Sequence, residues 1–235
     1  MIRKLFRYKT TIATILAKSS CHIEAAEEAM ISARQEIERV LIKDSLFGSS
    51  LEPVEYEPDS LVIKRMISAS NSAGTGPMAA VAGTIAWSGA EAMKKSGAEF
   101  GVVDNGGDIA FFSDRVLRVG LYAGSSSLSG KMAFVFPPTE NIYGVCTSSA
   151  TVGPSISFGT FDSATVFSSD VSLADAWATS ACNVLNLHDN EELIKKLEFA
   201  KVDGLFGVLG DSAIKWGKIP EIADADVDEK LITAG

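Results

Sequence analysis

The sequence has few of the side chains on which many active sites depend. In 235 residues it contains two histidines, His22 and His188, and three scattered cysteines, Cys21, Cys146 and Cys182. The cysteines have neither metal-binding spacing nor the even number typical of a disulfide framework. No Walker phosphate loop and no Gly-x-Ser-x-Gly elbow occurs. The cysteine pattern therefore favours a reducing, cytoplasmic location.

Basic clusters and long apolar runs are also scarce. The chain has 21 Lys and Arg against 30 Asp and Glu, a net charge of −9, and no basic run beyond Arg3-Lys4 and Arg7. This balance argues against nucleic acid as a partner. The longest run of small apolar residues, 78–93, is too short to span a bilayer. The N-terminal segment lacks the apolar core of a signal peptide, so we predict no membrane association.

The overall balance of apolar and charged residues is that of an ordinary globular protein. Hydrophobic residues make up 46% and charged residues 22% of the chain. The length is sufficient for a full hydrophobic core, as one domain over 1–235 or as two intimately packed halves. We expect the acidic tail over 220–235 to be loosely held.

The hydrophobic patterns predict both helices and strands. Helices are predicted over 22–42, 77–95, 172–187 and 190–199. Strands are predicted over 5–17, 101–104, 108–112, 115–122, 131–136, 142–147 and 164–167, with a terminal hairpin of 203–209 and 213–219. The segment 61–69 is compatible with either helix or strand, and 48–60 with a polar loop. The short turns between the earlier strands favour an antiparallel meander.

The segment Val103–Ile109 carries the first candidate site. It places Asp104 and Asp108 on either side of Asn105-Gly106-Gly107, between two apolar runs. Two glycines permit a turn with positive φ and let backbone approach a ligand closely. A plain hairpin turn is an equally good explanation of Asn-Gly, but it does not need the two carboxylates.

The segment Leu173–Thr179 carries the second candidate site. Asp175 and Thr179 are one helical turn apart in an otherwise apolar helix, so both oxygens lie on one side. They are candidate ligands for Mg²⁺, which takes carboxylates together with phosphates and water. The alternative is a helix-dipole role for Asp175 and a back-bonded hydroxyl for Thr179.

Two further segments offer groups for an oxyanion. The loop containing Asn71, Gly74 and Gly76 leads into the helix 77–95, which we expect to be central, with free N-terminal amides. The segment 146–170 is dense in hydroxyls and glycines, and a merely solvated loop is its alternative explanation. Its candidate ligand-binding residues are Thr147, Ser148, Ser149, Gly153, Ser155 and Ser157.

Taken in order, these motifs resemble the ApbE family of FAD-dependent flavin transferases. The segments are Asp-Asn-Gly-Gly-Asp-Ile (104–109), the Ser/Thr-rich stretch, and Leu-Ala-Asp-Ala-x-Ala-Thr (173–179). With 74–83 and 146–159, they are most similar to an uncharacterised, soluble, ApbE-like branch of archaea and anaerobic bacteria. The resemblance covers about residues 5–210. It implies an α+β fold with a mixed, mostly antiparallel sheet and packed helices.

The resemblance also implies a site. In the transferases FAD lies against the Gly-Gly segment, a divalent ion is held partly by the residues matching Asp175 and Thr179, and FMN is moved onto a Thr or Ser of a target protein. Those enzymes carry a catalytic His between the two motifs, whereas 146–170 contains none. Asp162 is a weak candidate for the missing base and Cys146 for a reactive thiol.

Three hypotheses follow. The leading one is a cytoplasmic ApbE-like protein that binds a nucleotide or other phosphorylated ligand, such as FAD or FMN, with Mg²⁺ as the candidate metal. The second is an FAD-dependent FMN transferase or FAD pyrophosphatase with a replaced base. The third is a non-catalytic accessory protein in sulfur assimilation towards homocysteine, a role associated with the archaeal branch. A homo-oligomer or a protein partner is compatible with each.

Overall fold

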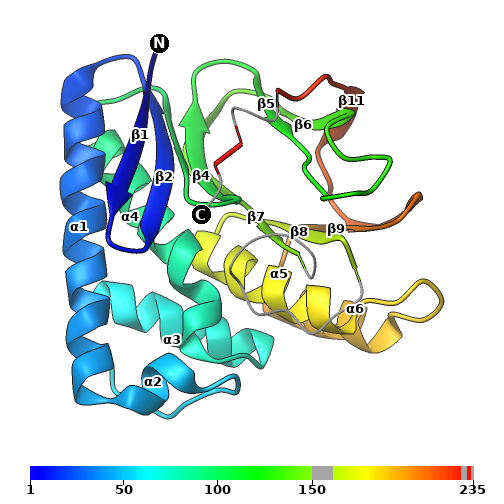
Figure 1. The fold of residues 1–235 in the computed structure, drawn as a ribbon, viewed down its shortest axis with the longest axis horizontal. Coiled ribbons are helices and arrows are strands. Elements are labelled where there is room, and N and C mark those ends of the chain that lie inside the picture. Colours follow the sequence, from blue (N-terminus) through cyan, green and yellow to red (C-terminus); the bar gives the residue numbers. More distant parts are fainter. Residues whose placement is uncertain (150–160, 229–231, 234–235) are drawn as a thin grey trace.

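The chain folds around a large sheet that carries helices on one face and a small sheet on the other (Figure 1). The computed structural model describes residues 1–149, 161–228 and 232–233. All strand pairs among these residues are antiparallel. The α+β class with a mostly antiparallel sheet is therefore confirmed.

The large sheet has the strand order β1-β2-β3-β4-β7-β8-β9-β10. Its strands are β1 Ile2–Tyr8, β2 Thr11–Ala17, β3 Gly101–Asp104, β4 Asp108–Ser113, β7 Thr139–Ser148, β8 Ser163–Ser168, β9 Gly204–Leu209 and β10 Ser212–Gly217. The small sheet has the order β11-β6-β5, with β5 Leu117–Gly120, β6 Met132–Phe136 and β11 Glu221–Asp224.

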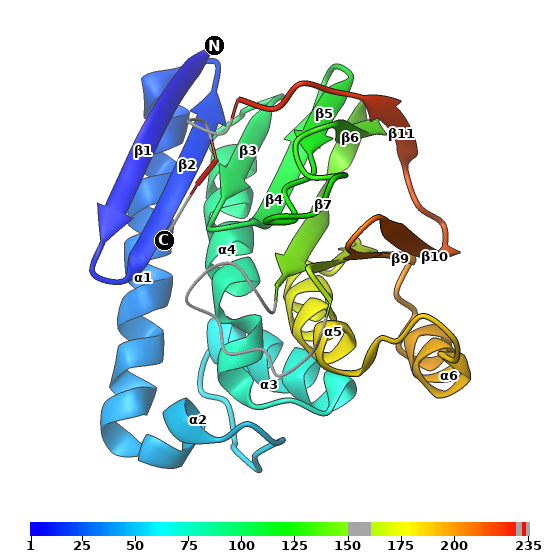
Figure 2. The same cartoon turned by 45° about the vertical axis from the view of Figure 1, so that its right-hand side comes forward.

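The helices cover one face of the large sheet (Figure 2). They are α1 Ser20–Lys43, α2 Ser45–Ser49, α3 Leu61–Ala73, the 3-10 helix η1 Pro77–Ala80, α4 Val81–Lys95, α5 Val171–Val184 and α6 Glu191–Ala200. Helix α4 is central, as expected, because small residues such as Gly89 and Ala90 let it pack closely on α1 and the sheet. None of the helices in the described parts of the chain is both long and apolar enough to cross a bilayer.

Alternate residues of the central strands face two separate cores. On β4, Ala110 and Phe112 pack against the helices, whereas Phe111 packs against the small sheet with Phe134 and Phe136. Pleating places successive side chains on opposite faces, so one strand serves both layers. Asp108 has the same parity as Ala110 and therefore lies on the helix side.

The segment 5–17, predicted as one strand, is instead the hairpin β1–β2. Its turn includes Lys9 at a φ of 53°, and the ammonium of this residue contacts Glu38 of α1. Sequence rules assign such left-handed turn positions to Gly, Asn or Asp. The prediction missed the turn because a lysine occupies it.

The described part of the C-terminal segment contains a strand that was not predicted. Residues 221–224 pair with β6 as strand β11, and the amides of Ala225 and Val227 donate to Lys131 and Gly130. These contacts join residues more than 80 positions apart, which local patterns do not reveal. Two local outcomes remain. The segment 61–69, which was left open between helix and strand, is helical within α3, and the predicted helix 77–95 begins as the 3-10 helix η1.

Gly144 of β7 is predicted to be essential for the position of α5. A Cβ at this residue would lie 2.9 Å from the Cα of Val171 and 3.1 Å from the carbonyl oxygen of Ser168. Because backbone atoms cannot move aside easily, Gly144→Ala should lower the free energy of unfolding by about 1–3 kcal/mol. Urea denaturation measures this change.

Gly48→Ala is the matched control. A Cβ at Gly48 would meet Leu41 Cδ2 at 2.8 Å, the end of a flexible side chain, and alanine is favoured in helices by about 1 kcal/mol. Gly48→Ala should therefore cost much less than Gly144→Ala. Equal losses in the two variants would contradict this account.

Candidate functional site

The turn between β3 and β4 is built by its two glycines. Gly106 and Gly107 have φ values of 73° and 99°, which side chains other than glycine rarely adopt. The amide of Gly107 donates to Asp104 Oδ1 at 2.9 Å, and the amide of Asn105 donates to the carbonyl of Asp108 at 3.0 Å. The motif is thus a closed turn with a carboxylate at each end.

This turn is fixed between α4 and β7. Asn105 is buried, and its Nδ2 donates to the carbonyl of Ala82 in the first turn of α4 at 3.0 Å. On the other side, the amide of Thr147 donates to the carbonyl of Gly107 at 3.1 Å. Two elements that are distant in sequence therefore set the position of the Gly-Gly backbone.

Asp175 of α5 binds the N-terminus of α4. Its carboxylate accepts a hydrogen bond from the amide of Gly83 at 2.7 Å and another from the amide of Ala82. A Cβ at Gly83 would lie 2.8 Å from Asp175 Cβ, so only glycine allows this approach. The expectation that the helix offers free amides to an external anion is wrong for these two groups, because the protein's own carboxylate uses them.

A second contact holds the same two helices together. The hydroxyl of Thr84 on α4 donates to the carbonyl of Ala80 at 2.6 Å and lies 2.8 Å from Ser172 Oγ on α5. Both hydroxyls are fully buried. The relative position of α4 and α5, and with it that of Asp175, is therefore set by polar contacts as well as by packing.

Three carboxylates share this region with little opposing positive charge. Burial raises the pKa of Asp175 to about 7, against the hydrogen bonds from Gly83 and Ala82. Burial also raises the pKa of Asp108, and the negative charges of Asp175 and Asp104 raise it further. The pKa of Asp104 is raised by burial and lowered by contacts with Thr233, Gly107 and the more distant Arg3. Such mutual repulsion is what a bound cation relieves.

Cys146 is a buried neighbour of these carboxylates. It pairs with Asp108 across the β4–β7 ladder, and its Sγ lies 3.5 Å from the carbonyl oxygen of Val171. Burial and the charges of Asp108 and Asp175 raise the pKa of the thiol well above its usual range. Because the thiolate is the reactive form, this setting argues against Cys146 as a thiol carrier.

Hydroxyl groups occur where β7 ends and β8 begins, and at Thr75 in the loop after α3. Thr147 Oγ1 and Thr165 Oγ1 are 2.9 Å apart, and one donates to the other. The hydroxyls of Ser148, Ser163 and Thr75 are buried without a hydrogen-bond partner among the described residues. Unpaired buried hydroxyls are uncommon and point to a missing partner. Three predicted ligand residues, Gly153, Ser155 and Ser157, lie outside the described residues.

The segment 71–76 ends α3 and packs on the loop that contains Ser50 and Leu51. Asn71 is exposed in the last turn of α3, and Gly74 ends that helix at a φ of 69°. The amide of Gly76 donates to the carbonyl of Leu51 at 2.9 Å, and a Cβ there would lie 1.9 Å from Ser50 O. Thr75, which the sequence analysis did not single out, is the residue of this loop with an unpaired buried hydroxyl.

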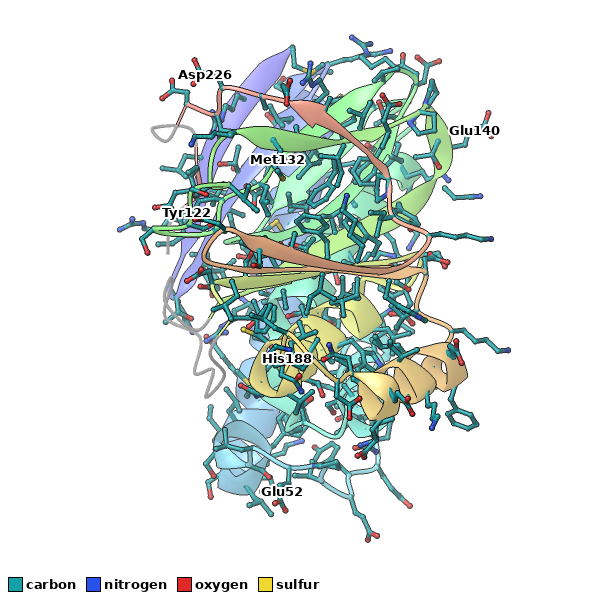
Figure 3. All side chains as sticks on the ribbon, turned by 90° about the vertical axis from the view of Figure 1, so that its right-hand side faces the viewer. Glu52, Tyr122, Met132, Glu140, His188 and Asp226 are labelled. Atoms are coloured by element: carbon teal, nitrogen blue, oxygen red, sulfur yellow. The ribbon has the colours of Figure 1, made fainter. Side chains whose placement is uncertain are left out.

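The candidate base Asp162 and the two histidines make other contacts or lie on other elements. The Oδ2 of Asp162 accepts from the amide of Gly210 at 2.7 Å and so fastens the β9–β10 turn. His22 Nδ1 lies 2.7 Å from Ser96 Oγ at the other end of α4, and His188 lies in the turn between α5 and α6 (Figure 3). Thr179, half-buried, follows Asp175 by one turn of α5.

Two threonines that the sequence did not indicate complete the surroundings of Asp104. Thr233 Oγ1 is hydrogen-bonded to Asp104 Oδ2 at 2.6 Å and lies 2.9 Å from Thr14 Oγ1 of β2. No spacing rule links positions 14, 104 and 233, so only the fold reveals this contact.

A metal at this site would be held by fewer than three acidic, histidine or cysteine side chains of the described residues. Within the described ranges, no group of three or more His, Cys, Asp or Glu side chains is arranged to hold a metal ion. Mg²⁺ is commonly bound by one or two carboxylates, with water and substrate phosphates completing the shell. Asp175 and Thr179 would suit that kind of site.

Comparisons with known proteins identify the family of the chain. The family model described as "AbpE bacteria" matches residues 8–205. The UPF0280 proteins of Methanosphaerula palustris and Methanoregula boonei are 53% and 50% identical over 235 and 236 residues, covering all of this chain and 99% of each relative. The resemblance to an ApbE-like branch is thereby confirmed.

Two solved structures share the fold. Flavinyl transferase ApbE of Pseudomonas stutzeri, in its apo form, is 12% identical with a TM-score of 0.56, covering 100% of this chain and 98% of that one. Flavin transferase ApbE of Vibrio cholerae is 13% identical with a TM-score of 0.54, covering 92% and 96%. At these identities the likeness establishes the fold alone.

The carboxylate cluster predicts that stability falls as pH rises. Carboxyl groups whose pKa is higher in the folded than in the unfolded state bind extra protons when folded, so the free energy of unfolding decreases between about pH 4 and pH 7. Asp175→Asn should remove on the order of 2–4 kcal/mol of this decrease. Urea denaturation at several pH values in EDTA measures it.

The exposed Asp59 supplies the control, since Asp59→Asn should keep the wild-type pH dependence. If Asp175→Asn also keeps the wild-type pH dependence, the ionisation of Asp175 does not cause the predicted loss of stability.

Proposed function

Because the chain belongs to the ApbE-like family of UPF0280 proteins, we propose that it binds a nucleotide or another phosphorylated ligand together with Mg²⁺. The binding site consists of the Asp104–Asp108 turn, the end of β7, and Asp175 with Thr179 on α5. The observation that carries the proposal is the convergence of three carboxylates with raised pKa values and little opposing charge. The reaction that follows binding is not assigned.

The cation half of the proposal rests on charge. Asp175 is buried, and its negative charge raises the pKa of Asp108, so ionising both carboxyl groups costs free energy. A divalent ion bound to Asp175 would stabilise both ionised forms at neutral pH. Thr179, one turn later on the same helix, supplies a neutral oxygen on the same side.

The phosphate half rests on an open backbone turn and on unpaired hydroxyls. The Gly106-Gly107 backbone carries no side chains that would keep a ligand away, and Gly106 is exposed. The unpaired hydroxyls of Ser148 and Thr75 are donors of the kind that bind phosphate oxygens. FAD and FMN are the first ligands to test, since the solved structures with this fold are flavin transferases.

Wild-type protein is expected to bind FAD or ADP only when Mg²⁺ is present. Asp175→Asn should weaken binding by about 10- to 100-fold, because the amide removes a charge-assisted contact. Thr179→Val, which keeps the side-chain volume, should weaken it less. Equilibrium dialysis and thermal shift, each with Mg²⁺ or EDTA, measure the change.

Asp59→Asn is the control for a lost surface carboxylate and should bind as wild type does. Mg²⁺-independent binding that is also unchanged in Asp175→Asn would refute the proposed site.

A second candidate function is FAD cleavage or FMN transfer with a carboxylate as the base. The observation that favours it is the pKa of Asp175, raised to about 7, because a base acts best near the pH of its medium. In cleavage, water attacks a phosphorus of the FAD diphosphate, the bridging P–O bond breaks, and FMN and AMP are formed.

This candidate predicts Mg²⁺-dependent formation of AMP and FMN from FAD at neutral pH. Asp175→Asn should reduce kcat by about 100-fold or more, the usual effect of a lost general base, while Asp59→Asn retains it. Chromatographic separation of FAD, FMN and AMP measures turnover. If the protein binds FAD but forms no AMP, the ligand-binding function is supported and FAD cleavage is excluded.

The cytoplasm is the proposed location. Cys21 and Cys146 take part in no disulfide bond, which is in keeping with a reducing compartment.

A further inference from the structure

Thr233 of the C-terminal segment docks on one of the three carboxylates. Its Oγ1 lies 2.6 Å from Asp104 Oδ2 and 2.9 Å from Thr14 Oγ1 of β2, and the residue is 7% exposed. A distance of 2.6 Å is typical of a hydroxyl that donates to an ionised carboxylate, which is a strong class of hydrogen bond. The hydroxyl of Thr233 therefore occupies Asp104 Oδ2 in this structure.

The two oxygens of Asp104 have donors of different origin. The amide of Gly107 donates to Oδ1 at 2.9 Å, and this bond belongs to the turn itself. The donor to Oδ2 comes from a residue 129 positions later in the sequence. Because an ionised carboxylate only accepts hydrogen bonds, a ligand group that takes the place of Thr233 must itself be a donor or a cation.

The segment that carries Thr233 is anchored in two places. The first anchor lies on the small sheet, where β11 pairs with β6 and the amides of Ala225 and Val227 donate to the carbonyls of residues 130 and 131. Val227 also packs closely on β5, because a Cβ at Gly120 would lie 2.7 Å from its Cγ2. The second anchor is the contact of Thr233 with the large sheet, beside β2 (Figure 2).

The two anchors differ in strength. The first consists of a strand pair, two further backbone hydrogen bonds and the packing of Val227. Within the described residues, the hydrogen bonds that hold Ile232 and Thr233 to the large sheet both pass through one hydroxyl, and Ile232 is only half-buried. Loss of that hydroxyl would therefore release the second anchor and leave the first in place.

We propose that the C-terminal segment is an autoinhibitory strap, and that a ligand of the Asp104–Asp108 turn must displace Thr233 from Asp104. The strap comprises Ala225–Val227 at the first anchor and Ile232 with Thr233 at the second. The proposal rests on the function proposed above, because it concerns access to the same site. Docking of Thr233 raises the apparent Kd, since only molecules in which it is released are competent to bind.

Two substitutions at one position test the strap. Thr233→Val keeps the side-chain volume but would leave Asp104 Oδ2 without its donor, whereas Thr233→Ser keeps the hydroxyl. In the presence of Mg²⁺, Thr233→Val should bind ADP or FAD about tenfold more tightly than wild type, the effect of one lost charge-assisted hydrogen bond. Thr233→Ser should bind as wild type does. Equilibrium dialysis measures the affinities.

Methyl NMR signals report on the docking of the strap. Addition of ADP or FAD with Mg²⁺ to wild type should move the Ile232 methyl signals towards random-coil values and leave those of Val227 unchanged, because the first anchor remains. In Thr233→Val the Ile232 signals should already have these values without a ligand. In Thr233→Ser they should be those of unliganded wild type.

The outcomes separate the strap from the site that it covers. The strap alone is overturned if ADP or FAD binds with equal affinity to Thr233→Val and Thr233→Ser, or if binding leaves the Ile232 signals of wild type unchanged. If neither ligand binds to any of the three proteins, Thr233→Val included, the function proposed above is overturned and the inhibitory role of the strap with it.

Discussion

The hydrogen bonds from the first turn of α4 to the carboxylate of Asp175 are the contact on which the rest of the site depends. They join residues 92 positions apart in the sequence, on two helices that also meet at the hydroxyls of Thr84 and Ser172. The helix dipole favours a negative charge at this place, while burial opposes it. Asp175 is thereby held in a position where ionisation is costly at neutral pH unless a cation is near.

The same contact orders the surrounding backbone. Ala82, whose amide donates to Asp175, also accepts a hydrogen bond from Asn105 through its carbonyl. The turn at Gly106-Gly107 is in this way tied to the end of α4 that Asp175 occupies. Any shift of α5 would be transmitted to the turn through one residue. The carboxylates and the Gly-Gly backbone can therefore act together on a single ligand.

Local patterns were sufficient to predict much of the fold. The helices α1, α5 and α6, the strands β3, β4 and β6, and the hairpin β9–β10 follow hydrophobic periodicities that depend on neighbouring residues alone. The hairpin at Lys9 and the strand β11 were missed. The first has an unusual turn residue, and the second pairs with a strand about 90 residues earlier.

The candidate site was predictable in its residue types but not in its contacts. Asp104, Asp108 and Asp175 were identified from their motifs, and the fold brings them within electrostatic reach of one another. The analysis of the motifs did not predict that Asp175 would occupy the amides expected to bind a ligand. Gly83 was the available signal, because a glycine inside a helix costs about 1 kcal/mol and calls for a packing reason. Thr14, Thr75 and Thr233 had no such signal.

The central claim is that the Asp175 cluster holds a divalent cation only together with a phosphorylated ligand. Paramagnetic relaxation by Mn²⁺, used in place of Mg²⁺, tests it most directly. With ADP or FAD present, Mn²⁺ should broaden the amide signals of Gly83, Gly106 and Gly107, and it should leave them sharp in Asp175→Asn. Broadening that is centred elsewhere, or that is the same in Asp175→Asn, would contradict the account.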